Sequence, residues 1–215
     1  MWIYFRTMEP GYLPWYIRAW EADLLIQVLQ NLTSAIAYLS LEEVEVDFDG
    51  GETLMRSFSQ EKGTWLNQVV KMPPRLVITP RLIVDNESLM ADLKKRKRNN
   101  ACLEFDVVYL PAPIQEKKGD RPYLPRMVLL VDRDSGGLID QHTSDKDDEI
   151  EVAILEMLTI YITNYGRPTS INVRDDRAAR YIGDYCQKSG IKLIEGKGVP
   201  AVDSFLGGLL DSLSR

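Results

Sequence analysis

Apolar and polar positions in the second half of the chain predict a regular series of strands and helices. Met127 to Val131 is wholly apolar, as in a strand covered on both faces, and Leu138 to His142 follows after a loop of turn-forming residues. Ser144 or Asp145 can cap a helix that runs to about Tyr165, where a glycine and a proline end it. These segments predict a two-stranded hairpin followed by a helix that lies on a sheet.

The same kind of pattern continues toward the C-terminus. Thr169 to Val173 and Ile191 to Ile194 are rich in β-branched and apolar residues, which predicts two more strands. The segment between them is a predicted helix, capped by Asp175 or Asp176. A last amphipathic helix is expected from Pro200 onward.

One further strand, Cys102 to Pro111, precedes this series and carries acidic residues on one side of an otherwise apolar element. An acidic group inside a central strand is costly unless it is paired. With this strand in front, the order is β-β-β-α-β-α-β-α, with the first three strands antiparallel and the later ones returning by crossovers. That order is the ribonuclease H-like fold, an α/β fold with a mixed sheet.

The first part of the chain predicts a smaller α+β region. Apolar residues at helical spacing predict one long amphipathic helix from Trp20 to Ser40. Val44 to Phe48 and Thr53 to Phe58 flank a glycine-rich turn and are expected to form a hairpin, to which Leu76 to Ile78 adds a strand. A second helix is expected to begin near Asn86.

The basic run Lys94 to Arg98 ends this region, and Asn99-Asn100 after it is the predicted domain boundary. The domains are then an N-terminal α+β region, 1–100, and a ribonuclease H-like domain, 101–215. We interpret the basic run as a solvated helix end, with a phosphate-binding patch as the alternative. The aromatic segment Pro10 to Trp15 is expected to pack back on its own helix rather than to form a ligand platform.

Composition narrows the function further. The chain has 215 residues, 45% of them hydrophobic, and a net charge of −6, which does not favour a nucleic-acid partner. No uninterrupted apolar run reaches the roughly 18 residues of a membrane span, so we expect a cytoplasmic protein without a membrane partner. The only two cysteines, Cys102 and Cys186, are expected to be separate thiols, and the single histidine, His142, argues against a His-rich metal site.

At the level of residues, the C-terminal part resembles a known catalytic core. The run FDVVYLP, then LLVDRDSGGLI, a helix, YGRPTSINVRDD, another helix and SGIKL is similar to retroviral integrases and related transposases over residues 101 to 213. The resemblance implies a metal-binding trio formed by Asp106, Asp175 or Asp176, and Asp203. The chain departs from the family pattern in two ways, with aspartate in place of the last glutamate and Asp176-Arg177 in place of asparagine-glycine.

The whole chain, including the PGYLPW opening, also resembles a family of bacterial proteins known only as domains of unknown function. That resemblance implies no activity. It leaves the chemistry to be argued from the residues themselves.

Each acidic residue of the trio also has a structural interpretation. Asp175 and Asp176 are ordinary helix caps, and Asp203 is an acid in a first helical turn. Asp106 either faces solvent at a sheet edge or pairs with Arg174. Because these roles need no metal, we favour them over catalysis.

The sequence therefore predicts a bacterial cytoplasmic protein whose ribonuclease H-like domain is non-catalytic, uses no cofactor and serves interaction or binding. The alternative is a nuclease or polynucleotidyl transferase in which Asp106, Asp175 and Asp203, with Asp176, bind Mg²⁺ or Mn²⁺. A protein partner could contact exposed aromatic residues near the N-terminus, for which the candidates are Trp2, Tyr4, Trp15 and Tyr16. A small-molecule pocket at the carboxyl ends of the parallel strands is a further candidate.

Overall fold

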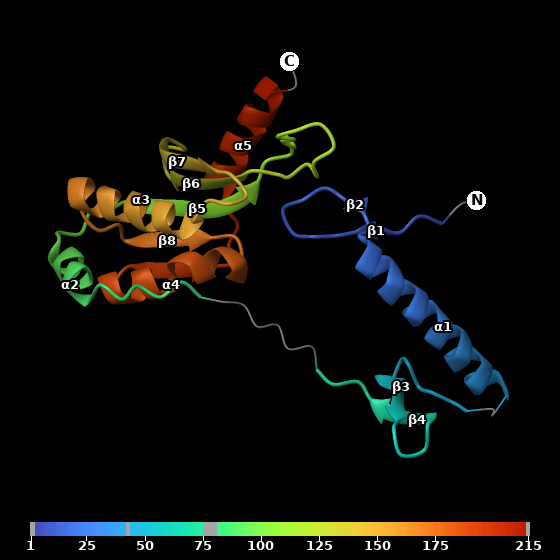
Figure 1. The fold of residues 1–215 in the computed structure, drawn as a ribbon. Helices are drawn as coiled ribbons and strands as arrows, with labels where there is room; N and C mark the ends of the chain where they lie inside the picture. The colour runs from blue at the N-terminus through green and yellow to red at the C-terminus, as the bar shows by residue number, and fades with distance from the viewer. Residues whose placement is uncertain (1–2, 42–43, 75–80, 214–215) are drawn as a thin grey trace. The chain divides into compact units, whose positions relative to one another are not determined.

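The computed structural model describes residues 3–41, 44–74 and 81–213, and the chain divides into two compact units. Unit 1 comprises Met1–Thr7 and Trp15–Ile78, and unit 2 comprises Met8–Pro14 and Thr79–Arg215. Figure 1 shows their elements in the colours of the chain. Hence a short segment from near the N-terminus belongs to the C-terminal unit.

Backbone hydrogen bonds hold this N-terminal segment in unit 2. The N–H of Leu13 donates to the carbonyl of Pro122 (3.0 Å), and the N–H of Leu124 donates to the carbonyl of Gly11 (2.7 Å). The ring of Tyr12 packs against that of Tyr123, with centroids 6.4 Å apart. The expectation that these residues pack on their own helix is therefore wrong for Tyr12, because main-chain pairing carries it to a distant loop.

Unit 1 contains a long helix and two small antiparallel sheets. Helix α1 spans Ala19–Leu41, close to the predicted bounds. Strands β1 (Arg6–Thr7) and β2 (Trp15–Tyr16) pair with each other, as do β3 (Glu52–Ser59) and β4 (Thr64–Lys71).

The hairpin predicted in this unit pairs the wrong two segments. Thr53 to Phe58 pairs with β4 through a turn that ends at Gly63, whose φ is +59°. Val44 to Phe48 is not a strand, because Asp47 closes a local turn by accepting the N–H of Gly50 (2.7 Å). The predicted strand at Leu76 to Ile78 lies outside the described residues.

Helix α1 is long and apolar enough, by length and composition, to cross a membrane, and none of its residues is buried. The criterion of an uninterrupted apolar run missed it, because polar residues such as Gln27 and Asn31 interrupt the sequence. Core helices of soluble proteins and signal sequences pass the same test. The finding by itself does not place the protein in a membrane.

Unit 2 is built on a five-stranded mixed sheet. Its strands are β5 (Cys102–Tyr109), β6 (Arg126–Asp132), β7 (Leu138–Ser144), β8 (Ser170–Val173) and β9 (Lys192–Glu195), in the spatial order β7-β6-β5-β8-β9. Strand β6 is antiparallel to β5 and β7, whereas β8 and β9 run parallel to β5. This order and these directions are those of the ribonuclease H-like fold, which confirms the predicted fold class.

Helices cover both faces of the sheet. On one face, α3 (Ile150–Tyr165) and α4 (Asp176–Ser189) pack on alternate residues of β5 and β6, including Phe105, Val128 and Leu130. On the other face, α5 (Pro200–Leu213) packs on Leu129 and Val131. Figure 1 shows α3 and α4 along the sheet and α5 emerging from its other side. Because side chains alternate along a strand, successive residues of β5 face different helices.

Helix α2 (Glu87–Lys95) belongs to the same unit. It is capped by Asn86, as expected, and it buries Met90 and Leu93 in the core formed with α3 and α4. Apart from the segment Met8–Pro14, unit 2 begins at Thr79, upstream of the boundary that the sequence predicts at residue 100. The basic run that suggested a boundary is the end of a helix docked on the domain.

The predicted N-terminus of α3 is also wrong. Ser144 is the last residue of β7, where it pairs with Arg126, and Asp145 accepts a hydrogen bond from the hydroxyl of Tyr123 (2.8 Å). Both residues are thus used by the sheet and its neighbouring loop, and the helix begins after Glu149 without a side-chain cap.

One mismatch of strand lengths positions the candidate site. The parallel register between β5 and β8 ends at Phe105 and Val173, whereas the pairing of β5 with β6 continues to Tyr109. The edge of β5 from Asp106 to Tyr109 is therefore not paired with β8. The chain leaves β8 at Arg174, at this same end of the sheet.

Candidate functional site

Asp106 lies at the point where β5 loses its β8 neighbour, and its side chain is almost completely buried, with 4% of the residue exposed. One carboxylate oxygen accepts the N–H of Val107 (2.9 Å), and the other accepts Nε–H of Arg174 (2.8 Å). Burial raises the pKa of Asp106, although the hydrogen bond and the charge of Arg174 act in the opposite direction.

Arg174 bridges Asp106 to a second acidic residue. Its Nη2 donates to Oδ1 of Asp203 at 2.6 Å, while its Nε holds Asp106. Asp203 lies in the first turn of α5, so one guanidinium connects β5, the end of β8 and α5. The hydrogen bonds from Asp203 and Asp106 raise the pKa of Arg174 further above its ordinary value. The structure shows the Arg174 pair that the sequence suggested as one of two alternatives for Asp106.

Asp175 and Asp176 have different partners. Asp175 caps α4 by accepting the N–H groups of Arg177 (3.0 Å) and Ala178 (3.1 Å), and its other oxygen accepts from the Arg177 guanidinium. Burial opposes its ionisation, but these hydrogen bonds outweigh it and lower the pKa of Asp175. Asp176 forms an ion pair with Arg180 one turn along α4. Of the four predicted residues, only Asp106 and Asp203 meet at a common partner.

This arrangement does not fit a magnesium or manganese centre. Such ions bind several oxygen ligands, with near-octahedral geometry for Mg²⁺, and phosphodiester chemistry uses two ions about 4 Å apart. Both carboxylate oxygens of Asp106 and both of Asp175 already accept hydrogen bonds from N–H groups. Within the described ranges, no group of three or more acidic, histidine or cysteine side chains could hold a metal ion.

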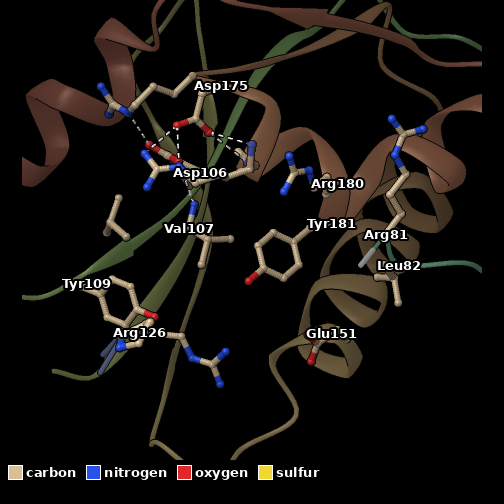
Figure 2. A pocket seen from close by; sticks show the side chains of 15 residues that line it. Arg81, Leu82, Asp106, Val107, Tyr109, Arg126, Glu151, Asp175, Arg180 and Tyr181 are labelled. Atoms are coloured by element: carbon tan, nitrogen blue, oxygen red, sulfur yellow. Dashed lines mark hydrogen bonds and ion pairs between the residues drawn. The ribbon is translucent and has the colours of Figure 1, made fainter. Parts of the chain in front are cut away.

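A cavity of about 740 Å³ opens beside Asp106, at the carboxyl ends of β5 and β8. Figure 2 shows Asp106 and Asp175 at one end of it and Arg126 and Glu151 at the other. The full lining is Pro10, Arg81, Leu82, Asp106, Val107, Val108, Tyr109, Arg126, Glu151, Arg174, Asp175, Arg177, Ala178, Arg180 and Tyr181. All of these residues belong to unit 2.

The sequence suggested Arg174 as a partner of Asp106 but did not point to the other four arginines of this cavity, Arg81, Arg126, Arg177 and Arg180. Arg174, Arg177 and Arg180 recur every three residues across the start of α4, a spacing that brings side chains toward one side of a helix. That signal was present in the sequence. Arg81 and Arg126 join them only through the fold, because they come from segments far apart in the chain.

A second buried acid, Glu104, was also missed as a specific residue. It is completely buried and faces α5, where one carboxylate oxygen accepts the N–H groups of Ala201 (2.8 Å) and Val202 (3.1 Å). The carboxylate therefore caps the N-terminus of α5, where negative charge is favourable. Its other oxygen lies 3.8 Å from Nε of Arg133. Glu104 thus fixes the start of the helix that carries Asp203.

Solved structures similar to this chain include viral integrases. The HTLV-2 integrase catalytic core domain, solved in complex with magnesium, is 22% identical, with a TM-score of 0.34; the match covers 50% of this chain and 66% of that one. A simian T-cell lymphotropic virus intasome is 21% identical, also with a TM-score of 0.34, and the match covers 53% of this chain and 40% of that one. Less than two thirds of each viral chain is matched, and these similarities concern the fold alone.

Comparison with curated proteins found no match. Two sequence families match the chain, and both are without an assigned function. A domain of unknown function (DUF7309) matches residues 1–56, and a second domain of unknown function (DUF6930) matches residues 89–210, which is more than half of the chain and includes the whole sheet of unit 2. The chain therefore belongs to the DUF6930 family.

Proposed function

We propose that the ribonuclease H-like domain of this protein is non-catalytic and acts, in the cytoplasm, as a binding module. The observation that carries the proposal is the guanidinium of Arg174, which bonds to both Asp106 and Asp203. A fixed positive group thus occupies the space between the two carboxylates, where a catalytic ion would have to bind.

The energetics of a buried carboxylate support this proposal. An acidic group buried in a sheet needs a compensating partner, and a metal ion or an arginine can serve. Here Arg174 supplies both the charge and the hydrogen bond, so Asp106 needs no ion. For a divalent ion to enter, Arg174 would have to leave two carboxylates at once.

The second candidate remains a nuclease or polynucleotidyl transferase. It is favoured by one observation: Asp106 on β5 and Asp203 on α5 converge on one cationic group, as two ligands of a metal would. In this alternative Arg174 must swing away when the ion binds. The remaining ligand would have to be Asp175, which would give up its role as the cap of α4.

A cleavage assay separates the two functions. The full chain is incubated with labelled single-stranded DNA, double-stranded DNA and RNA in millimolar Mg²⁺ or Mn²⁺, beside the Asp106→Asn variant. We expect no product that depends on the metal and on Asp106. Cleavage by the wild type that is lost in Asp106→Asn would overturn the proposal in favour of the nuclease. Equal traces in both proteins would point to a contaminant and leave the proposal standing.

A further inference from the structure

The cavity at the open edge of β5 has the size of a small-molecule site. Its volume of about 740 Å³ lies within the roughly 300 to 1,000 Å³ of typical ligand pockets. Proteins that bind single-stranded nucleic acid use instead a positive groove that follows the backbone over several nucleotides. The chain as a whole carries a net charge of −6, which also disfavours a long polyanion.

Most of the arginine charge in the cavity is balanced by acidic partners, two of which, Asp176 and Asp203, lie outside its lining. Five arginines and three carboxylates line it. Arg174, Arg177 and Arg180 pair with aspartates, whereas Arg81 and Arg126 form no ion pair with any residue that the structure describes. Two guanidinium groups are therefore available to an anion. The N-terminus of α4 adds little by hydrogen bonding, because Asp175 already accepts two of its N–H groups.

Arg126 is the best placed of these groups. Its Nη2 donates to the carbonyl of Asp148 (2.9 Å), which fixes the position of the guanidinium without neutralising its charge. Burial raises the pKa of Tyr181, while the charge of Arg126 and a hydrogen bond from it act in the opposite direction, so the Tyr181 hydroxyl lies beside this guanidinium. An arginine held by a neutral carbonyl retains donors that match two oxygens of a phosphate. This is the arrangement of an anion receptor rather than of a structural ion pair.

The rest of the lining indicates what accompanies the anion. Tyr109 and Tyr181 present aromatic rings in the cavity (Figure 2), and Leu82 and Val107 add apolar surface, so a flat organic ring can pack there. Glu151 also lines the cavity. A carboxylate is unfavourable beside a phosphate, but it is a good acceptor for a sugar hydroxyl, as in sites that bind ribose.

We propose that this cavity binds a small phosphorylated molecule that carries a ring and a sugar, which is the chemistry of a mononucleotide. Arg126 contacts the phosphate, and Glu151 accepts from a hydroxyl. The inference rests on the proposed function, because Arg174 must stay between Asp106 and Asp203 for the cavity to remain free of metal.

Isothermal titration calorimetry of the full chain tests the inference. The four ribonucleoside monophosphates, AMP, GMP, CMP and UMP, are titrated in buffer without divalent metal. The matching nucleosides, inorganic phosphate and a single-stranded oligonucleotide form separate arms. We expect saturable binding of at least one monophosphate. Its nucleoside should bind about tenfold more weakly, or more weakly still, because the nucleoside makes no charged hydrogen bond.

Two variants assign the site. Arg126→Gln is expected to weaken monophosphate binding about tenfold or more. Lys118→Gln, which removes the same charge from an exposed loop, is expected to leave binding unchanged. A thermal melt of each variant checks that it is folded. Arg126→Lys, which keeps the charge but loses the paired donors of the guanidinium, serves as the second variant if Arg126→Gln does not fold.

Four outcomes would overturn the inference. They are no binding of any monophosphate, equal binding by the arginine variant, equal binding of inorganic phosphate alone, and tighter binding of the oligonucleotide than of any monophosphate. None of them bears on the cleavage assay. Absence of monophosphate binding together with absence of cleavage would refute the ligand and leave the non-catalytic function in place.

Discussion

Replacing Arg174 by methionine perturbs the site most directly, because this one side chain holds acidic groups from β5 and α5. The side chain of Asp106 is 5% exposed and that of Asp203 is 54% exposed, while that of Arg174 is 40% exposed. Removing Arg174 leaves the buried carboxylate of Asp106 without its cation. Asp203 can be solvated by water when it loses the same partner.

The expected magnitude follows from these exposures. Removing one partner of a fully buried ion pair costs about 3–5 kcal/mol, whereas exposed pairs contribute about 0–1 kcal/mol. Because Arg174 is 40% exposed, water will screen part of the loss. We therefore expect Arg174→Met to lower the free energy of unfolding of unit 2 by about 2 kcal/mol. Nearly all of this should come from Asp106.

Urea unfolding followed by far-UV circular dichroism is the suitable assay. All four tryptophans lie at or before residue 65, so their fluorescence would report on unit 1. The double variant Arg174→Met/Asp106→Asn should be more stable than Arg174→Met by about 1 kcal/mol or more, because it no longer buries an unpaired charge. As a control, Arg177→Met removes an arginine that is 81% exposed, at a cost of under about 1 kcal/mol. Equal losses in Arg174→Met and Arg177→Met, or additive losses in the double variant, would refute the reasoning.

Four other predictions follow from single features. Burial raises the pKa of Asp106 above 3.8, so between that value and the raised one the folded state binds more protons than the unfolded state. The stability of the wild type relative to Asp106→Asn should therefore fall as pH rises through this interval. Urea melts of the two proteins measure this difference, in which the contributions of the other carboxylates cancel. Gly166→Ala should lower the free energy of unfolding by about 1–3 kcal/mol, because φ is +89° and a Cβ would lie 2.5 Å from the carbonyl oxygen of Lys97. Gly207→Ala, within helix α5, should raise the free energy of unfolding by about 0.5–1 kcal/mol. Chemical denaturation compares the two variants. Burial raises the pKa of the Cys186 thiol to about 12, so a thiol reagent should modify it only after unfolding, and rapid labelling in the native protein would contradict its burial. Finally, helix α1 carries polar residues throughout its length, so the protein should remain in the supernatant after high-speed centrifugation of a lysate. Retention in alkali-washed membranes would instead show that α1 spans a membrane.

The sheet of unit 2 could be predicted because its signals are local. The central strands β5 and β6 are short and mainly apolar. Several helix ends carry a marker in the sequence, such as Asp175 before α4 and Gly190 after it, with φ of +72°. The hairpin of unit 1 could not be predicted in the same way. Turn-forming glycines lie on both sides of β3, and the sequence does not say which turn joins paired strands.

The candidate site was harder to predict than the fold. Asp106 and Asp203 are among the acidic residues named from the sequence, and the structure brings both to Arg174. The sequence left Arg174 as one of two alternatives, since the direction of a residue just after a strand has no periodic signal. The cavity exists because β8 ends earlier than β5, and this difference in length appears only when the strands are paired. Residues such as Arg81 and Arg126 reach it from distant segments.

In the proposed function, Arg174 takes the place of a catalytic ion. A calorimetric titration of Mn²⁺ into the full chain tests it most directly, with Asp106→Asn titrated in parallel and a thermal melt in millimolar Mn²⁺ as the companion reading. The account predicts no saturable heat in either protein and no rise in melting temperature. Saturable binding to the wild type that raises its melting temperature and disappears in Asp106→Asn would contradict the account, because an ion bound only by the folded state must stabilise it.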